Sequence, residues 1–278
     1  MKIVVLTDSS ADITTKDARN KGLEIIRFPL IVDNENHIEE ETISMEEFTR
    51  RMYDGALAKT SQPSVGSLLE KWDELLKEYD HVIYACLSAG ISGAYDTALA
   101  QSRNYEGKVT VLDTCYVAYP MQILCEEIQA MINAGNTPEE IKEKIESSEK
   151  MEAILIPGDL QYLKRGGRIS PQAAALANLL KIVPLLLVAE GKIDAYEKVR
   201  TTKKAYDVAL SYFEERTENY EDYHWYVVHA DCEELGKEMQ ARLAEMTGQN
   251  VALEKIFPVI MAHTGPGSFA IGRSKKRV

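Results

Sequence analysis

The stretch from residue 81 to residue 104 constrains the fold more than any other part of the chain. An apolar run at residues 81–86 leads into the small-residue turn Leu87-Ser88-Ala89-Gly90-Ile91-Ser92-Gly93, and a helix-forming run follows. The first N–H groups of a helix lack carbonyl partners and carry partial positive charge. A strand, a serine-containing turn and a helix in this order are typical of an anion site. The alternative is that Ser92 only caps the helix.

Other short apolar runs in the first half of the chain alternate with helical patterns. Strands are predicted at residues 2–6, 23–32 and 108–112, and helices at 44–57, 65–79, 119–134 and after Thr137. Alternating strands and helices indicate βαβ units and a doubly wound parallel sheet. We therefore predict an α/β fold whose N-terminal domain spans residues 1–150.

The second half has a different pattern. Strands are predicted at residues 152–156, 225–229 and 251–261, and the turn Glu190-Gly191-Lys192 joins runs 182–189 and 193–199 into an antiparallel hairpin. Helices are predicted at residues 171–181, at 202–215, and from residue 231 or 232 to about 246. We predict a C-terminal mixed α/β domain at residues 151–278.

Composition excludes several classes of partner. The net charge is −12 and the charges are interspersed, which disfavours nucleic acid and anionic membrane surfaces. The N-terminal apolar run is too short for a signal peptide or a membrane span, so we expect a cytoplasmic protein without membrane insertion. The four cysteines include no C-x-x-C pair, and no residue set has metal-ligand spacing.

Three polar stretches are candidate binding segments. Thr60 and Ser61 lie upstream of the predicted cap Ser64, and their hydroxyls either bind something or bond to their own loop. Lys164 to Arg168 holds three cations and two glycines, which either wrap an anion or end a short helix. The stretch that begins at His263 contains G-x-G-x-x-A at residues 265–270, but no helix and acidic residue follow as a dinucleotide site requires.

Two alternatives follow from the residues alone. A serine esterase using Ser92 and His263 fits the chain order of α/β-hydrolases, although Gly93 directly follows the serine and the G-x-S-x-G spacing is not met. A binding module for another small anion, such as a sugar phosphate, is the second. A kinase acting alone is disfavoured because a phosphate-binding G-x-x-x-x-G-K-[ST] loop is absent from the sequence.

Six motifs in order over most of the chain resemble those of the DegV family. They are Asp8-Ser9-Ser10, Thr60-Ser61-Gln62-Pro63-Ser64, Leu87-Ser88 with Ile91-Ser92-Gly93 and Tyr95, Tyr162-Leu163-Lys164 with Gly166-Gly167-Arg168-Ile169-Ser170, Lys198-Val199-Arg200, and His263 with Gly265-Pro266-Gly267. The resemblance implies two α/β domains with a long-chain fatty acid in a tunnel between them and no other cofactor.

The resemblance also implies a function. The chain would be the fatty-acid-binding subunit of a bacterial fatty acid kinase and not an enzyme by itself. A separate ATP-binding subunit similar to dihydroxyacetone kinase would phosphorylate the presented carboxylate to an acyl phosphate for phospholipid synthesis.

Site residues carry over from the same resemblance. Thr60 or Ser61 and Ser92 would donate hydroxyls to the carboxylate, and Gly93 its N–H. His263 would lie beside the head group, Arg168 would shape the site, and Arg200 would contact the kinase subunit. The family's paired serines are Ser88-Ala89 here and its Gly-Thr is Gly93-Ala94, which leaves the part of Ser88 open. Candidates for the tunnel lining are apolar: Ile26, Phe28, Ile91, Ile156, Leu160, Leu163, Leu176, Leu179, Leu186 and Ile260.

Overall fold

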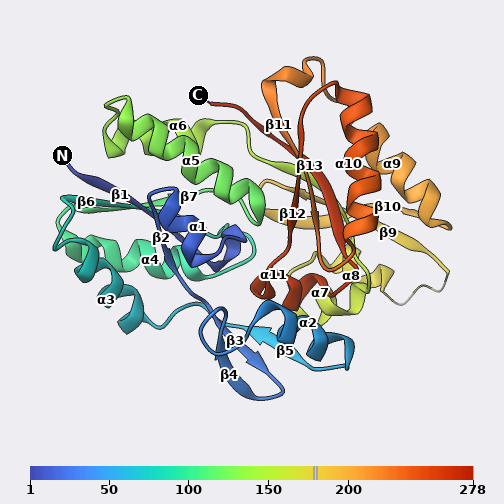
Figure 1. The fold of residues 1–278 in the computed structure, drawn as a ribbon, viewed down its shortest axis with the longest axis horizontal. Coiled ribbons are helices and arrows are strands. Elements are labelled where there is room, and N and C mark those ends of the chain that lie inside the picture. Colours follow the sequence, from blue (N-terminus) through green and yellow to red (C-terminus); the bar gives the residue numbers. More distant parts are fainter. Residues whose placement is uncertain (178, 180, 278) are drawn as a thin grey trace.

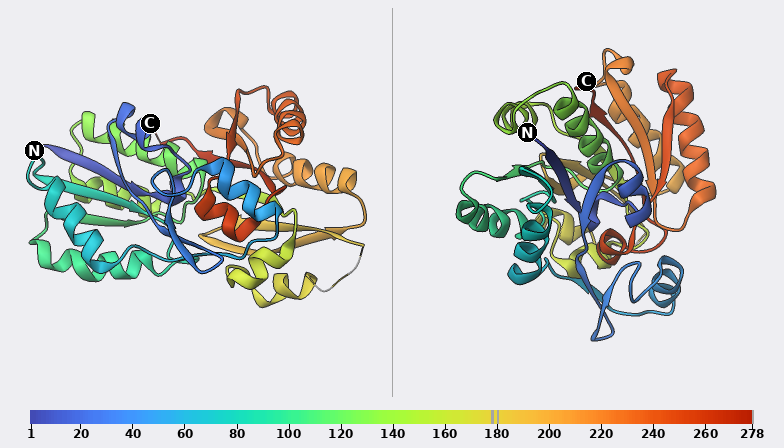
Figure 2. Two further views of the ribbon diagram at one scale, coloured as in Figure 1. Left: turned by 60° about the horizontal axis from the view of Figure 1, so that its bottom comes forward. Right: turned by 60° about the vertical axis from the view of Figure 1, so that its left-hand side comes forward.

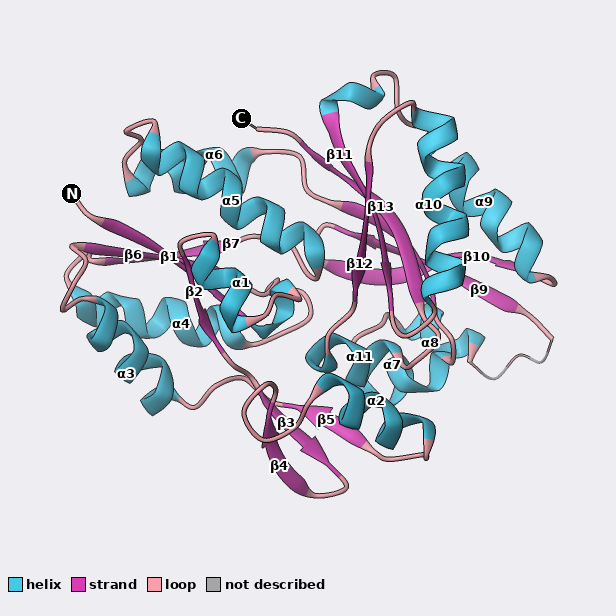
Figure 3. Cartoon of the chain, viewed as in Figure 1, coloured by secondary structure: helices cyan, strands magenta, loops and turns pink. Residues whose placement is uncertain are grey.

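The computed structural model describes residues 1–177, 179 and 181–277. Its first half contains a four-stranded parallel sheet in the order β2-β1-β6-β7 (Figure 1). Helices α5 and α6 cover one face and α3 and α4 the other (Figure 3). The predicted parallel α/β domain is confirmed. The strands are β1 (Ile3–Asp8), β2 (Leu23–Ile26), β6 (His81–Cys86) and β7 (Val109–Asp113), and the helices α1 (Thr15–Asn20), α3 (Val65–Leu75), α4 (Ala94–Ser102), α5 (Tyr119–Asn133) and α6 (Pro138–Ser147), with the 3-10 turns η1 (Ser9–Ala11) and η2 (Arg103–Tyr105).

The carboxyl ends of β1 and β6 meet at the centre of this sheet. The chain leaves β1 toward β2 on one side and returns to β6 on the other, so ligands are expected at this edge. The buried Asp8 carboxylate accepts the Leu87 N–H at 2.9 Å and the Ser10 N–H at 2.9 Å. One carboxylate therefore fixes both strand ends.

The second half contains a six-stranded mixed sheet in the order β10-β9-β8-β13-β11-β12. Only β11 and β12 are parallel, and the predicted 182–199 hairpin is present as β9 and β10. Helices α9 and α10 cover its outer face (Figure 1). The mixed domain is confirmed, with β8 (Glu152–Ile156), β9 (Val183–Ala189), β10 (Lys192–Val199), β11 (Tyr223–His229), β12 (Val251–Lys255), β13 (Phe269–Lys275), α7 (Leu160–Gly166), α8 (Pro171–Leu176), α9 (Thr202–Glu214), η3 (Tyr220–Asp222), α10 (Glu233–Thr247) and α11 (Pro258–Thr264).

Side-chain alternation divides this sheet into two faces. Ile154, Val227 and Ile271 belong to the core formed with α9 and α10. Their neighbours Ala153, Leu155 and Ala270 belong to the larger core shared with the first domain. Because successive residues of a strand point to opposite faces, one strand supplies both cores.

The structure departs from several sequence predictions of secondary structure. Residues 23–32 form two strands, because Pro29 has no N–H to continue a ladder and begins a new strand. Residues 251–261 split into β12 and α11, whose first residue Pro258 suits a helix start. The sequence analysis missed β13, where Gly272, Arg273 and Ser274 hide the apolar pattern. The helix predicted at 171–181 ends at Leu176, and positions 178 and 180 lie outside the described residues.

A third, small sheet links the two halves. It has the order β4-β3-β5, with β3 (Pro29–Val32), β4 (Glu35–Ile38) and β5 (Ala58–Thr60), and α2 (Met45–Tyr53) joins β4 to β5. Although its residues belong to the first half, β5 and α2 contact α11 of the second half. Figure 2 shows α2 beside α11. The boundary at residues 150 and 151 stays a prediction.

Two further contacts hold the large sheets together. Ser88 Oγ donates to the Gly191 carbonyl at 2.9 Å, joining the β6–α4 turn to the β9–β10 turn. Near the C-terminus the buried Arg277 guanidinium lies 2.9 Å from Glu127 of α5 and 2.6 Å from the Tyr116 hydroxyl. Among the described residues, no helix has the length and apolar character needed to cross a membrane.

The first of these contacts predicts the effect of Gly90→Ala. An added Cβ would lie 2.3 Å from the Gly191 carbonyl oxygen, which is backbone and cannot turn aside. We expect a loss of about 1–3 kcal/mol of unfolding free energy in urea denaturation. The matched control is Gly66→Ala in α3, where the nearest atom is 3.7 Å away and a gain of about 0.5–1 kcal/mol is expected. Equal stability of the two variants would contradict the close approach of the Gly90 and Gly191 backbones.

Candidate functional site

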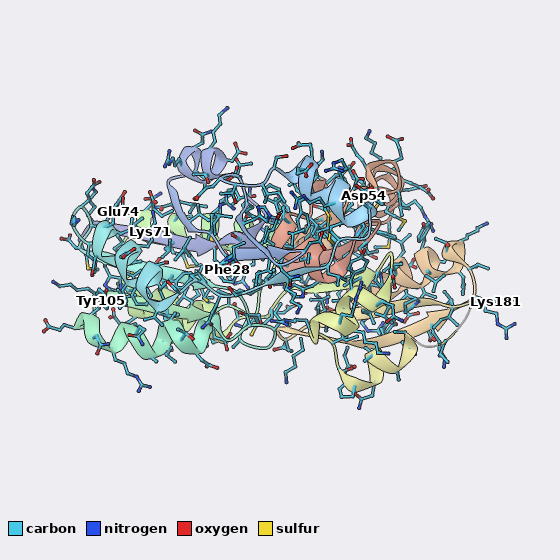
Figure 4. All side chains as sticks on the ribbon, turned by 90° about the horizontal axis from the view of Figure 1, so that it is seen from below. Phe28, Asp54, Lys71, Glu74, Tyr105 and Lys181 are labelled. Carbon is cyan, nitrogen blue, oxygen red and sulfur yellow. The ribbon has the colours of Figure 1, made fainter. Side chains whose placement is uncertain are left out.

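A cavity of about 920 Å³, including the space at its mouth, lies between the inner face of the six-stranded sheet and the first domain. Phe28, labelled near the middle of the molecule in Figure 4, is one of its walls. Most of its lining is apolar: Phe28, Leu87, Ile91, Val117, Ala118, Pro120, Met151, Ala153, Leu155, Leu163, Val188, Ile193, Val228, Ile256, Val259, Ile260 and Ala270. The polar lining is Thr60, Ser61, Gln62, Ser92, Arg168, Tyr226, His263 and Thr264.

Thr60 and His263 meet at the cavity from different elements. Thr60 ends β5, which pairs with β3, and is therefore a strand residue where the sequence suggested a loop. Its Oγ1 lies 2.7 Å from His263 Nε2 on α11. The small sheet thus carries a hydroxyl of the first half onto a helix of the second.

His263 is a neutral side chain. Burial, with the Arg168 guanidinium nearby, lowers the pKa of its imidazole to about 4. Its Nδ1 is buried and has no hydrogen-bond partner among the described residues. Gly166 makes the close packing possible, because a Cβ there would lie 2.5 Å from Nδ1. At neutral pH one hydrogen bond joins the neutral ring to the Thr60 hydroxyl, and the tautomer of the ring decides which of the two groups donates.

Arg168 brings a cation to the same end of the cavity. It follows α7, whose last residues turn at Gly167, and its Nη1 donates to the Gly166 carbonyl. The head of a bound anion would therefore face a positive side chain as well as hydroxyls. Arg168 adds charge-assisted hydrogen bonding, which is stronger than hydrogen bonding between neutral groups.

Ser92 lines the cavity just before α4. The N-cap residue of α4 is Gly93, and Ser92 Oγ accepts the Ala94 N–H at 3.2 Å. The hydroxyl proton of Ser92 is then left to donate elsewhere. Gln62, which the sequence analysis did not select, lies near this turn and exchanges hydrogen bonds with Thr97 of α4 at 3.0 and 3.2 Å.

The remaining predicted residues lie in different places. Ser61 lines the cavity and Gly93 does not. Ser88 is 1% exposed, absent from the lining and engaged with Gly191. Arg200 is exposed in the bend between β10 and α9.

The predicted apolar lining is partly wrong. Phe28, Ile91, Leu163 and Ile260 line the cavity. Ile156 belongs to the outer core, because it lies one residue out of phase with Leu155. Five more are absent from the lining: Ile26, Leu160, Leu176, Leu179 and Leu186. The missed residues follow the i, i+2 rule along the strands, as in Met151, Ala153 and Leu155. Sequence alone gives that pattern without saying which face is hollow.

The arrangement suits an amphipathic anion, with apolar walls behind a polar end. It does not suit serine hydrolysis. His263 Nε2 is paired with Thr60, and no acidic group orients its Nδ1 among the described residues. A base needs hydrogen-bond reach of its nucleophile and an orienting partner. The described residues also include no group of three His, Cys, Asp or Glu side chains suited to a metal ion.

The fold and cavity define a two-domain α/β protein with an apolar cavity between its sheets. The chain belongs to the DegV family: the model of this family of uncharacterised proteins matches residues 2–276. A DegV domain-containing protein of Streptococcus pneumoniae is 34% identical, with 98% of each chain covered.

Two solved structures with similar folds are described as fatty acid binding. The DegV family protein of Streptococcus agalactiae has a TM-score of 0.90 at 29% identity, with 100% of each chain covered. DegV of Bacillus subtilis has a TM-score of 0.88 at 28% identity, with 99% of this chain and 100% of that chain covered.

The depressed pKa of His263 predicts a pH effect on stability. Above the unfolded-state pKa of 6.5 the ring is neutral in both states. Between that value and about 4 only the unfolded chain takes up the proton, so stability falls as the pH falls, by about 3 kcal/mol in total. Denaturation of the wild type and of His263→Asn from pH 8 to pH 4 checks this. A difference between the two curves that stays constant over this range would contradict the assignment.

Proposed function

We propose that this protein binds a long-chain fatty acid in the cavity, with the carboxylate at the end formed by Thr60, Ser92, His263 and Arg168. The observation that carries the proposal is that these side chains, from four separate segments, line one largely apolar cavity. The fatty acid binding described for the Streptococcus agalactiae and Bacillus subtilis relatives supports it.

The energetics favour an acyl chain. Each buried methylene contributes about 0.8 kcal/mol, so a chain of roughly 14 methylenes supplies on the order of 11 kcal/mol before association costs. A carboxylate away from water needs strong hydrogen bonds. The Thr60 and Ser92 hydroxyls and the Arg168 guanidinium supply donors, and the Gly93 N–H adds one if the turn admits the head group.

Thr60 and His263 would act together on the head group. If the neutral ring carries its proton on Nε2, it donates to Thr60 Oγ1, and the Thr60 hydroxyl proton is free for the carboxylate. Ser61 stays a second candidate donor, although its Oγ donates to the Gln62 carbonyl at 3.2 Å.

We further propose that the protein presents this carboxylate to a separate ATP-binding kinase subunit, similar to dihydroxyacetone kinase, for conversion to an acyl phosphate. The carrier itself would hold and orient the substrate. Arg200 is the proposed contact for that subunit. Its side chain is exposed and has no ion-pair or hydrogen-bond partner among the described residues, so its charge is available to an acidic surface.

Mass spectrometry of an organic extract of the purified protein tests binding. A long-chain fatty acid is expected at close to one per chain, and added fatty acid should raise the melting temperature of stripped protein. An extract without fatty acid, together with no thermal shift, would refute the proposal. Competition by a sugar phosphate without competition by acyl chains would favour the small-anion alternative.

Ser92→Ala removes one charge-assisted hydrogen bond. We expect fatty acid affinity to fall by about 1.5–3 kcal/mol, or roughly 10- to 150-fold, in a displacement assay. Ser64→Ala is the matched control. Ser64 caps α3 by accepting the Ser67 N–H at 3.0 Å and is absent from the lining. The control should lose about 1 kcal/mol of stability and keep its affinity. Unchanged affinity in Ser92→Ala would remove Ser92 from the head-group site.

Arg200→Ala should separate presentation from binding. We expect fatty acid affinity to stay unchanged while acyl phosphate formation with the cognate kinase subunit falls at least tenfold, because an exposed interfacial cation is lost. Arg103→Ala, an exposed cation on the first domain, is the control. Equal rates for both variants would show that Arg200 is not a docking residue.

A further inference from the structure

The strand register orders the residues that line the cavity from the inner face of the six-stranded sheet. Met151, Ala153 and Leu155 line the cavity from β8 and the residue before it, and Tyr226 and Val228 line it from β11. Ala270 of β13 pairs with both Leu155 and Val228, and Gly272 pairs with both Ala153 and Tyr226. The lining residues therefore form successive rows down the sheet.

The residues of the polar end come from the carboxyl end of β8 and from the β10 edge of the sheet. Gly158, two residues after β8, lies against the Pro266 carbonyl, and the Gly267 N–H donates to the Ala230 carbonyl at 2.7 Å. These contacts place the loop that follows His263 at the carboxyl end of β8. Arg168 and Ser92 lie toward the β10 edge, because the Ser170 N–H donates to the Ile193 carbonyl of β10 at 3.1 Å, and the Ser92 N–H donates at 3.1 Å to the carbonyl of Ser88, which contacts Gly191. Tyr226 of β11 lies on the opposite side of β8 and β13 from that edge.

The Tyr226 side chain lies across the sheet in the row that it shares with Gly272 and Ala153. A Cβ added to Gly272 would lie 2.5 Å from both Cζ and Oη of Tyr226, so the ring occupies the space that a side chain at Gly272 would fill. Its hydroxyl donates to the Glu152 carbonyl on β8 at 3.2 Å, one strand further on. The ring thus spans β13 from β11 to β8.

The first domain packs against this ring from its other side. Tyr119, at the start of α5, meets Tyr226 edge-on with ring centroids 6.4 Å apart. Its neighbours Ala118 and Pro120 line the same cavity. Tyr226 is 1% exposed. The Tyr226 ring is therefore held by a hydrogen bond to the second half of the chain and by a ring contact with the first.

We propose that Tyr226, lying across Gly272, walls the cavity on its β11 side and limits the length of the acyl chain. Ala153, in the same row, is the position at which side-chain size adjusts that limit. This inference rests on the proposed function. A larger side chain at position 153 shortens the space from the head group to the wall, and a smaller one at position 226 lengthens it.

The test is competition among saturated fatty acids of 12 to 20 carbons, offered as an equimolar mixture to stripped protein and measured by mass spectrometry. Ala153→Val adds two methyl groups to the cavity, and the preferred length should fall by about two carbons because interiors are close-packed. Tyr226→Leu should shift the preference toward longer chains by a similar amount.

Two controls separate the wall from general effects. Tyr226→Phe keeps the ring and loses only the bond to Glu152, so its profile should match the wild type. Ala205→Val adds the same volume to the outer core, where Ala205 is fully buried on α9, and should destabilise the fold without moving the profile. If Tyr226→Leu does not fold, Ala153→Val decides alone.

The outcomes distinguish this inference from the function beneath it. A wild type that takes up no fatty acid overturns the proposed function and the inference together. A wild type that binds, with Ala153→Val showing the same profile, overturns the inference alone. A shift in Ala205→Val as large as that in Ala153→Val would also overturn it, because the effect would then not be local to the wall.

Discussion

The inner face of the six-stranded sheet has to be covered, and the first domain covers it incompletely. β8, β11 and β13 carry apolar side chains on both faces, so the sheet needs a partner on each side. Helices α9 and α10 fill the outer face closely. On the inner face, small residues such as Ala153 and Ala270 leave a space, and the cavity is what remains once the two halves dock.

Docking depends on close backbone approaches. The Gly90 and Gly191 backbones lie nearer to each other than side chains would allow. The Ser88 hydroxyl donates its hydrogen bond to the Gly191 carbonyl at the same contact. Near the C-terminus, Arg277 and Glu127 form a buried ion pair, which is costly to break because one charge would remain unpaired. The polar end of the cavity is therefore assembled between parts held at fixed distances.

The electrostatics of that end combine one cation with neutral donors. Arg168 is the cation among the polar lining residues, and the burial of His263, together with the charge of Arg168, lowers the pKa of its imidazole and keeps it neutral. The sequence analysis assigned the carboxylate's donors to hydroxyls and the Gly93 N–H, and gave Arg168 the role of shaping the site. With Arg168 present, a carboxylate gains charge-assisted bonds, while neutral His263 and Thr60 orient one another without adding a second charge to an enclosed space.

The sequence by itself determined the parallel sheet, the mixed sheet, the Ser44, Ser64 and Thr137 helix caps and the family motifs, because these depend on local periodicity, on single capping side chains and on short strings of residues. It also placed Thr60, Ser61, Ser92, Arg168 and His263 in a shortlist that shares one cavity.

Tertiary structure decided what local patterns do not encode. Whether Leu155 or Ile156 faces the hollow side depends on which face the first domain covers. The strand β13 exists because both its neighbours are in place, although Gly272, Arg273 and Ser274 give it little strand character. The pairing of Thr60 with His263, 203 positions apart, depends on a small sheet that Pro29 separates from the large one. Such contacts arise from packing between distant segments, and no window of sequence contains them.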